Sequence, residues 1–163
     1  MAKKTHTKKN VIKKFTYSLT PVEEIAVRNE LPVKEVREAY RKCRMAVLKE
    51  TIQDIRKGKA NINYFNLMDR VFSLTEEYLD AKRLKEIHEQ EKLYCLNDFS
   101  VENGLTYSNV KNIYSRFNSR LFSNPDLNNL ERVIDYNPEL SQKAFDLTKK
   151  YFSIQSHGKL NLR

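Results

Sequence analysis

Hydrophobic residues recur every three or four positions along most of the chain, which is the period of one face of an α-helix. The longest such stretch begins near Val33 and can continue to Arg56, just before Gly58. Its apolar positions are Val36, Ala39, Tyr40, Cys43, Val47, Leu48, Ile52 and Ile55. Only 3 glycines and 4 prolines interrupt the 163 residues. The pattern therefore predicts an all-α fold.

Capping signals place the start of several helices. Thr20 is followed by Pro21 and Glu23, a combination that predicts an N-cap with a capping box. In the middle of the chain we expect a buried helix over 62–74, followed by a helix over 75–96 with many charged residues. Ser73 with Glu76 offers a second capping box at the start of the latter.

Two further helix starts share the dipeptide Asn-Pro, with Asn as the N-cap and Pro as the first helical residue. They are Asn124-Pro125 and Asn137-Pro138. The residues from about Ser153 read as a frayed tail. Tyr78, Ala81, Leu84 and Ile87 follow one another at three-residue steps, so they predict a face that packs on a neighbouring helix or forms a dimer seam.

One pattern occurs twice, 74 residues apart. "NELPVKEVREAY" covers 29–40, and "NGLTYSNVKNIY" covers 103–114. The repeat matches what two helices that cross after a tight turn need: a small residue at the crossing, a turn residue, an apolar plug and apolar locking residues. The matched pairs are Ile25 with Phe99, Ala26 with Ser100, Glu30 with Gly104, Leu31 with Leu105, Val36 with Val110 and Ala39 with Ile113. The sequence thus predicts two helix-turn-helix units.

The stretch "PVEEIAVRNELPVKEVREAYRKCRMAVLKE" resembles the helix-turn-helix of sigma factor region 4 and its regulator relatives, with a weaker echo over 96–122. The resemblance covers about thirty residues. It departs from the family at the turn, where Glu30-Leu31-Pro32 replaces a turn that contains Gly. No other sigma-factor segment is visible. The resemblance implies a DNA-reading module within a different protein.

The second helix of each predicted unit supplies the candidate DNA contacts, because its N-terminal residues would approach base edges in the major groove. In the first unit these residues are Lys34, Arg37, Glu38 and Arg41, with Lys42 and Arg44 better placed for phosphates. Arginine can form two hydrogen bonds with guanine, and glutamate can accept a hydrogen bond from the amino group of cytosine. Glu35 and Glu38 could instead form ion pairs with basic neighbours on the helix surface. In the second unit the candidates are Thr106, Tyr107, Ser108, Asn109, Lys111, Asn112 and Arg116. This second face is polar and little charged, so it is also typical of a solvated or protein-binding surface.

The positive charge is concentrated at one end of the chain. Residues 1–58 hold 15 Lys and Arg against 7 Asp and Glu, out of a net charge of +9. Residues 1–14 carry six lysines and no acidic residue. This pattern predicts a flexible basic arm that can contact the phosphate backbone of a nucleic acid. Such a distribution favours double-stranded DNA as the partner, while an acidic protein or a lipid surface would also suit a basic chain.

Enzyme chemistry is not visible in the pattern. His6, His88 and His157 lie far apart and make no metal-ligand spacing with a cysteine, and neither a phosphate-binding glycine loop nor a nucleophile motif occurs. We therefore expect no enzymatic activity, no cofactor and no metal. Cys43 and Cys95 read as buried free thiols of a reducing compartment. No secretory or membrane-spanning segment is recognisable, so a cytoplasmic protein is expected.

The expected organisation is a basic arm (1–14), a first helix-turn-helix unit (15–58), a helical connector (59–95), a second helix-turn-helix unit with C-terminal helices (96–153) and a tail (154–163). The expected function is a sequence-specific regulator of transcription that binds double-stranded DNA, as a monomer or a homodimer. Two alternatives stay open. One is a protein-binding regulator that docks on RNA polymerase or a replication protein, and the other is a replication-origin or partition factor.

Overall fold

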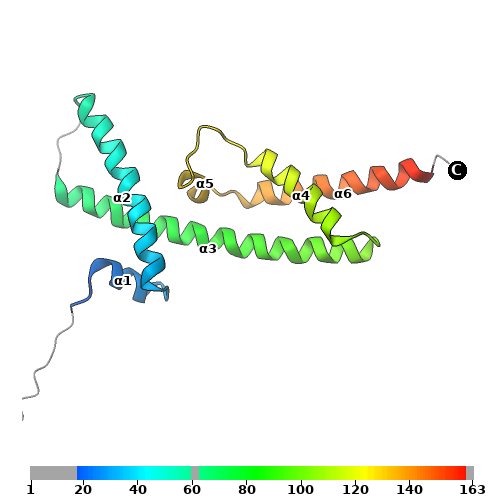
Figure 1. The fold of residues 1–163 in the computed structure, drawn as a ribbon, viewed down its shortest axis with the longest axis horizontal. Coiled ribbons are helices and arrows are strands. Elements are labelled where there is room, and N and C mark those ends of the chain that lie inside the picture. Colours follow the sequence, from blue (N-terminus) through cyan, green and yellow to red (C-terminus); the bar gives the residue numbers. More distant parts are fainter. Residues whose placement is uncertain (1–17, 60–62, 161–163) are drawn as a thin grey trace, which may run out of the picture.

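The computed structural model describes residues 18–59 and 63–160. Within these ranges the chain forms six helices and no strand, which confirms the predicted all-α class (Figure 1). The helices are α1 (Pro21–Arg28), α2 (Val33–Arg56), α3 (Tyr64–Glu102), α4 (Tyr107–Leu121), α5 (Glu131–Ile134) and α6 (Pro138–Leu160). The predicted basic arm, 1–14, lies outside the described residues.

Several predicted helix ends are confirmed. The Thr20 hydroxyl accepts from the Glu23 amide at 3.4 Å and the Glu23 carboxylate accepts from the Thr20 amide at 2.8 Å, which completes the capping box of α1. The helix expected from Val33 to Arg56 is α2. At the start of α6 the Asn137 side chain accepts from the Glu139 amide at 2.8 Å.

The predicted break in the middle of the chain is wrong. Residues 64–102 form one helix, α3, and Ser73 and Glu76 lie inside it rather than at an N-terminus. No glycine or proline occurs between Tyr64 and Glu102, so the segment contains no residue that typically weakens or breaks a helix. Within a helix the amide groups that a capping box would satisfy are already bonded to the preceding turn.

Two predictions near the C-terminus are also wrong. No helix begins at Asn124-Pro125, and only the short α5 forms in that region. The Arg132 guanidinium donates to the carbonyl oxygens of Asn124 and Leu127, at 3.0 and 3.1 Å, and so stabilises an irregular segment. The tail expected from Ser153 is helical, because α6 continues to Leu160.

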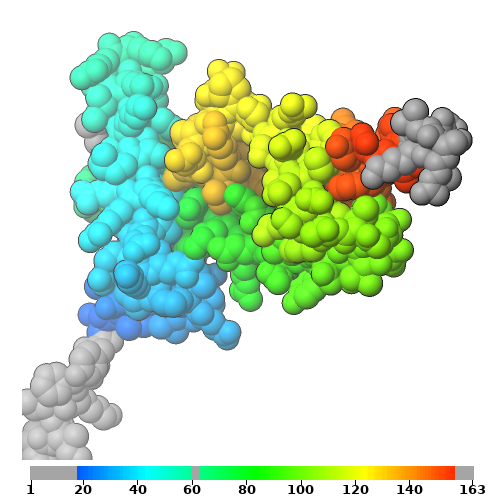
Figure 2. Space-filling view, turned by 45° about the vertical axis from the view of Figure 1, so that its right-hand side comes forward, coloured from blue at the N-terminus to red at the C-terminus, as the bar shows by residue number. Residues whose placement is uncertain are grey.

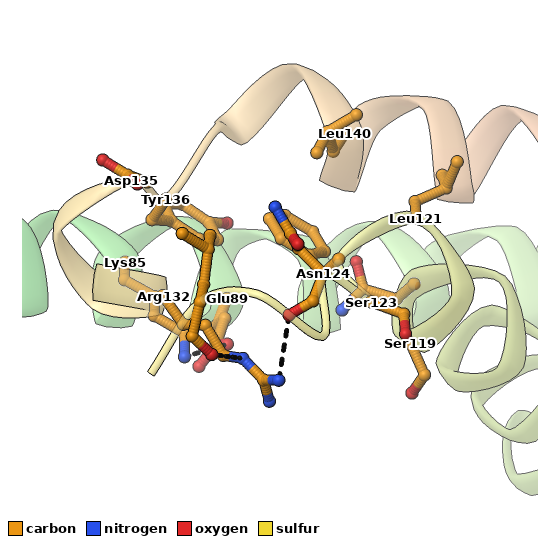
Figure 3. A pocket seen from close by; sticks show the side chains of 13 residues that line it. Lys85, Glu89, Ser119, Leu121, Ser123, Asn124, Arg132, Asp135, Tyr136 and Leu140 are labelled. Atoms are coloured by element: carbon orange, nitrogen blue, oxygen red, sulfur yellow. Dashed lines mark hydrogen bonds and ion pairs between the residues drawn. The ribbon is translucent and has the colours of Figure 1, made fainter. Parts of the chain in front are cut away.

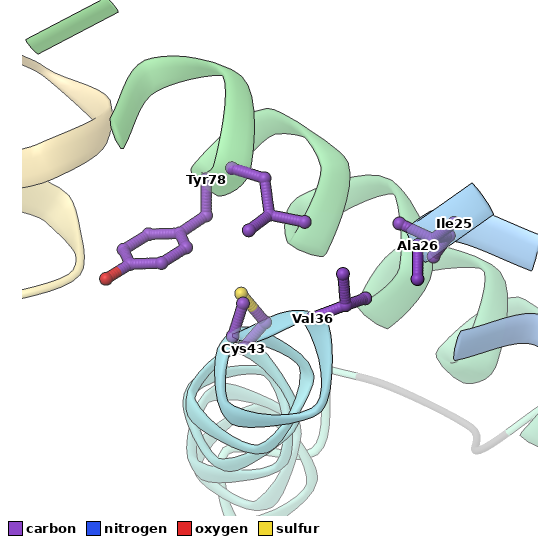
Figure 4. Packing of buried hydrophobic residues seen from close by; sticks show 7 residues of the cluster. Ile25, Ala26, Val36, Cys43 and Tyr78 are labelled. Atoms are coloured by element: carbon purple, nitrogen blue, oxygen red, sulfur yellow. The ribbon is translucent and has the colours of Figure 1, made fainter. Parts of the chain in front are cut away.

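The helices assemble around two small cores. The first, which we call the core of unit one, joins α1, α2 and the N-terminal half of α3 (Figure 4). Its buried members are Ile25, Ala26, Val36, Ala39, Cys43, Tyr78 and Leu79. Three apolar side chains at and just before α5 pack against the core of unit one: Leu130, Val133 and Ile134. Figure 2 shows the segment between α4 and α6 lying beside α2.

The second core, that of unit two, joins the C-terminal end of α3, α4 and α6. Its buried hydrophobic members are Leu96, Val110, Tyr114 and Ala144. The hydroxyl groups of Tyr114 on α4 and Ser141 on α6 are hydrogen-bonded at 2.7 Å, which satisfies two polar groups in this core. α3 therefore belongs to both units.

The two turns that follow α1 and α3 have the same backbone structure. Glu30 has φ +55° and Gly104 has φ +61°, at equivalent positions of the 74-residue repeat. The Leu31 amide donates to the Ala26 carbonyl at 2.9 Å, and the Leu105 amide donates to the Ser100 carbonyl at 2.8 Å. The side-chain amides of Asn29 and Asn103 each donate to the carbonyl four residues earlier at 2.9 Å. The sequence repeat is thus a repeat of backbone geometry.

A third element of the repeat escaped the sequence analysis. "VFSLTEEYL" at 71–79 of α3 matches "AFDLTKKYF" at 144–152 of α6, with an offset of 73 residues. Thr75 and Thr148 are both fully buried, and each hydroxyl donates to the carbonyl four residues earlier, at 2.7 and 2.8 Å. Each unit therefore has three helices in the same order, and α3 serves as the third helix of unit one and the first helix of unit two.

The two units also have a similar orientation in the view of Figure 1. α3 and α6, whose matching segments are equivalent, run in the same direction, and α2 and α4 both rise from lower right to upper left. The centres of the two cores lie near Thr75–Leu79 and Leu96–Ser100 on α3, a separation of roughly 30 Å at the rise of an α-helix. α3 acts as the spacer between the units.

The row of apolar residues on α3 turns away from the cores. Tyr78 is buried, but Leu84 and Ile87 are each about half exposed, because a three-residue step drifts around a helix of 3.6 residues per turn. Cys43 is buried as predicted. The prediction that Cys95 is buried is wrong, because it lies on the exposed side of α3 next to the buried Leu96.

Candidate nucleic-acid interface

The N-terminal turns of α2 carry a row of exposed cations. Lys34, Arg37, Arg41 and Arg44 follow one another at steps of three or four residues, so they lie along one side of the helix. All four are exposed, and none makes a hydrogen bond or ion pair with another described residue. The apolar residues between them, Val36 and Ala39, face the core and fix the rotation of α2. The cations therefore point outward from a rigid helix.

Acidic residues near this row are arranged in two ways. Glu38 is exposed and makes no ion pair with a described residue, so it stays available beside Arg37 and Arg41. Glu35 is half-buried and accepts a hydrogen bond from Lys82 of α3. This bond raises the pKa of Lys82 and keeps its ammonium group charged. Glu35 thus fastens α2 to α3, rather than pairing along the surface of its own helix.

Lys42 differs from the other predicted contacts of α2. Its ammonium group donates to the Tyr78 hydroxyl at 3.5 Å and lies 5.7 Å from the centre of the Tyr78 ring. This places Lys42 on the side of α2 that turns toward α3. Its charge is still exposed to solvent, but its position is set by an aromatic contact.

Glu23 of α1 lies near the same surface. Hydrogen bonds from the backbone and the hydroxyl of Thr20 hold the pKa of Glu23 below its ordinary value, and the positive charge of Arg37 lowers it further. α1 is therefore coupled to the start of α2 both by the turn and by charge.

The equivalent face of α4 is polar and carries less charge. Thr106, Ser108, Asn109, Lys111, Asn112 and Arg116 are exposed. Tyr107 is half-buried against the core of unit two, and the Lys111 ammonium lies 6.0 Å from its ring centre. By the 74-residue offset Tyr107 corresponds to Val33, which packs in the same way on the core of unit one. The ring thus has a packing role that its sequence position did not reveal.

The structure brings the predicted residues together in two separate groups. The predicted residues of unit one lie on α2. Those of unit two lie on α4 and on Thr106 just before it, and α3 separates the two groups. Two further cations of α2, Lys49 and Arg56, escaped the sequence analysis, because they lie beyond the turns that approach a groove in a helix-turn-helix. The length of α2, considered together with the spacing of its basic residues, could have indicated Lys49 and Arg56.

A separate hollow of about 510 Å³ opens between α3, α4 and the segment before α6 (Figure 3). The stacked rings of Phe122 and Tyr136, with centres 5.4 Å apart, belong to its wall. Burial raises the pKa of the Tyr136 phenol, so it is neutral at physiological pH. None of the predicted DNA contacts lines this hollow.

Across 18–59 and 63–160 no cluster of three or more His, Cys, Asp or Glu side chains could hold a metal ion. Among the same residues no helix combines the length and the apolar character that crossing a membrane requires. Comparison with protein-family models, curated proteins and solved structures gives no match to the chain.

Proposed function

We propose that the chain is a sequence-specific regulator of transcription that binds double-stranded DNA and has no enzymatic role. The observation that carries the proposal is the row of exposed cations, Lys34, Arg37, Arg41 and Arg44, on the helix that follows the tight turn of unit one. In this proposal the start of α2 enters the major groove, Arg37 and Arg41 contact base edges, and Arg44 contacts phosphate.

Unit two adds the second half of the proposed recognition. Exposed Asn109 and Asn112 on α4 can read adenine through their side-chain amides, and Thr106 and Ser108 can hold phosphate. The low charge of this face supports a smaller share of the affinity than α2 supplies, because phosphate neutralisation dominates binding strength.

A second function is favoured by the same low charge. The face of α4 carries only Lys111 and Arg116 among the predicted contacts, which suits a protein partner such as RNA polymerase or a replication protein. In that case α2 would position the protein on DNA, or on an acidic partner, and α4 would make the specific contact.

The experiment that tests the proposal is selection of bound duplexes from a random library, followed by titration of the enriched site at two salt concentrations. We expect an enriched motif and a steep salt dependence. Arg37→Ala and Arg41→Ala should each weaken the enriched site by about 1–3 kcal/mol. Lys143→Ala, which removes an exposed charge from α6, is the matched control and should have little effect.

A conservative variant separates base reading from general attraction. Arg37→Lys keeps the charge but loses the bidentate grip, so it should relax specificity while the salt dependence stays near that of the parent protein. Two results would overturn the proposal and favour a protein partner. One is a selection that enriches no motif, and the other is an equal loss of affinity for the enriched site in Lys143→Ala and Arg37→Ala.

A further inference from the structure

A groove of about 870 Å³ runs along α2 from Lys42 to Arg56, and Lys42 is the one predicted DNA contact that lines it. Its floor is apolar and comes from three parts of the fold: Met45, Leu48 and Ile52 of α2, Tyr78 of α3 and Leu130 just before α5. Figure 2 shows this part of α2 standing beside the segment between α4 and α6, with a notch open to solvent between them.

The floor leaves apolar side chains in water. Met45 is 68% exposed and Ile52 is 48% exposed, although both lie on a well-formed helix. Neither contributes to the core clusters, so folding does not explain why these positions are hydrophobic. A contiguous apolar surface framed by charged side chains is typical of a binding site.

The charge of the groove is of one sign. The charged residues that line it are Lys42, Lys49 and Arg56, and no acidic residue lines it. Lys49 and Arg56 make no hydrogen bond or ion pair with any residue in the described part of the chain. The adjoining hollow, which shares Ala46, Asn128 and Leu130 with the groove, is different. Its charged lining residues are Glu50, Glu77, Glu131, Asp135 and Arg70. The cationic lining is therefore specific to this groove.

The length of the groove sets the size of its occupant. Lys42 and Arg56 are about four turns apart, or roughly 20 Å along α2. An amphipathic helix of about 14 residues spans that distance and places anchors at every third or fourth position on the floor. The basic N-terminal segment of the chain itself, with six lysines and no acid in 1–14, has the wrong charge for this surface.

We propose that this groove docks an amphipathic helix of a partner protein, whose apolar face covers Met45 and Ile52 and whose flanking Asp or Glu residues pair with Lys49 and Arg56. Binding buries the uncovered apolar floor and satisfies cations that have no partner within the described fold. The inference does not rest on DNA binding by the first turns of α2. Of the predicted DNA contacts Lys42 alone lines the groove, and the residues assigned to the partner helix all lie C-terminal to those contacts: Met45, Lys49, Ile52 and Arg56.

The test uses a designed probe of defined chemistry. A fluorescein-labelled helical peptide of about 16 residues carries leucines on one face and glutamates on both flanks, and its twin has lysine in place of each glutamate. Fluorescence anisotropy with the full chain should show saturable binding of the acidic peptide and much weaker binding of the basic twin.

Variants locate the site. Ile52→Asp, which disrupts the floor, and the pair Lys49→Glu with Arg56→Glu, which reverses the lining charge, should each weaken the acidic peptide by about tenfold or more. The charge-reversed pair should in turn bind the basic twin more tightly than the parent protein does. Val101→Asp, at an exposed apolar position of α3 outside the groove, is the matched control and should leave binding unchanged. Circular dichroism verifies that each variant is folded.

Four results would overturn the proposal. Equal binding of the two peptides, or equal effects of Ile52→Asp and Val101→Asp, would show that the groove is not the site. A dimer in sedimentation velocity that Ile52→Asp dissociates would assign the groove to a second copy of the chain. Loss of duplex DNA affinity in the Lys49→Glu, Arg56→Glu variant, with no peptide binding by the parent protein, would assign these cations to phosphate.

Discussion

At the scale of single residues, contacts divide the charged side chains of α2 into separate roles. Glu35 is joined to Lys82 of α3 and therefore holds the helix in place. Arg37 and Arg41 make no such bond with any described residue and remain available to a ligand. The division follows from rotation about the helix axis, because Val36 and Ala39 are buried and fix which side faces outward.

The two cysteines differ most clearly in their surroundings, and a labelling experiment should report it. Cys43 is buried, its thiol lies 3.6 Å from the Leu74 carbonyl oxygen, and burial raises the pKa of this thiol above its ordinary value. Because the thiolate is the reactive form, Cys43 should resist alkylation in the folded protein, whereas exposed Cys95 should react. Timed iodoacetamide labelling followed by peptide mass mapping measures both sites.

Denaturant supplies the control for this labelling, because guanidinium should make both thiols reactive. Cys95→Ser should remove the labelling seen in the folded protein. Modification of Cys43 in the folded protein as fast as that of Cys95 would contradict the packing of unit one.

At the scale of elements, the two tight turns are the most informative comparison. Both place their central residue at positive φ, but one of these residues is Glu30 and the other is Gly104. Side chains with a Cβ are disfavoured there by about 1–2 kcal/mol, so unit one carries backbone strain that unit two avoids.

Substitutions at these two turns should therefore change the free energy of unfolding in opposite directions. Glu30→Gly should raise the free energy of unfolding, and Gly104→Ala should lower it, each by about 1 kcal/mol. A Cβ at Gly104 meets no atom within 4 Å, so the cost there comes from the backbone and not from a clash. Urea unfolding measures both values.

Glu30→Ala is the control for the lost carboxylate, because it removes the side-chain charge and keeps the Cβ. It should leave the stability close to that of the parent protein. A Glu30→Gly variant no more stable than Glu30→Ala would show that the turn carries no strain.

At the scale of the whole molecule, the tandem arrangement makes a prediction about the DNA site. The two units follow each other along α3 with similar orientation and a separation of roughly 30 Å, close to one turn of B-DNA. If α2 and α4 both read DNA, one chain should prefer two unlike half-sites in direct rather than inverted orientation, about one helical turn apart. Gel-shift titration of synthetic duplexes with direct, inverted and half-turn-shifted half-sites measures this preference.

The stoichiometry of that complex provides the control, because a monomer on a direct repeat differs in mass from a dimer on an inverted one. Preference for the inverted site, with two chains bound, would mean that a symmetric dimer reads the DNA and that the tandem within one chain has another purpose.

Hydrophobic periodicity and capping residues were sufficient to predict the all-α class, the bounds of α2, the start of α1 and the start of α6, because these depend on local hydrogen bonds and helical period. The 74-residue repeat was also visible in the sequence, since both turns need the same residues at the same steps. The continuity of α3 was not predicted, because the helical middle offered a capping signal that tertiary packing did not use.

Only the tertiary structure decided which surfaces are free. It showed that Tyr107 packs on a core, that Cys95 faces solvent, and that Thr75 and Thr148 occupy equivalent buried positions. It also placed Leu130 opposite Met45 and Ile52 to form a groove. These outcomes depend on which helices meet across long sequence separations, and a helical pattern fixes the face that is apolar but not the partner that covers it.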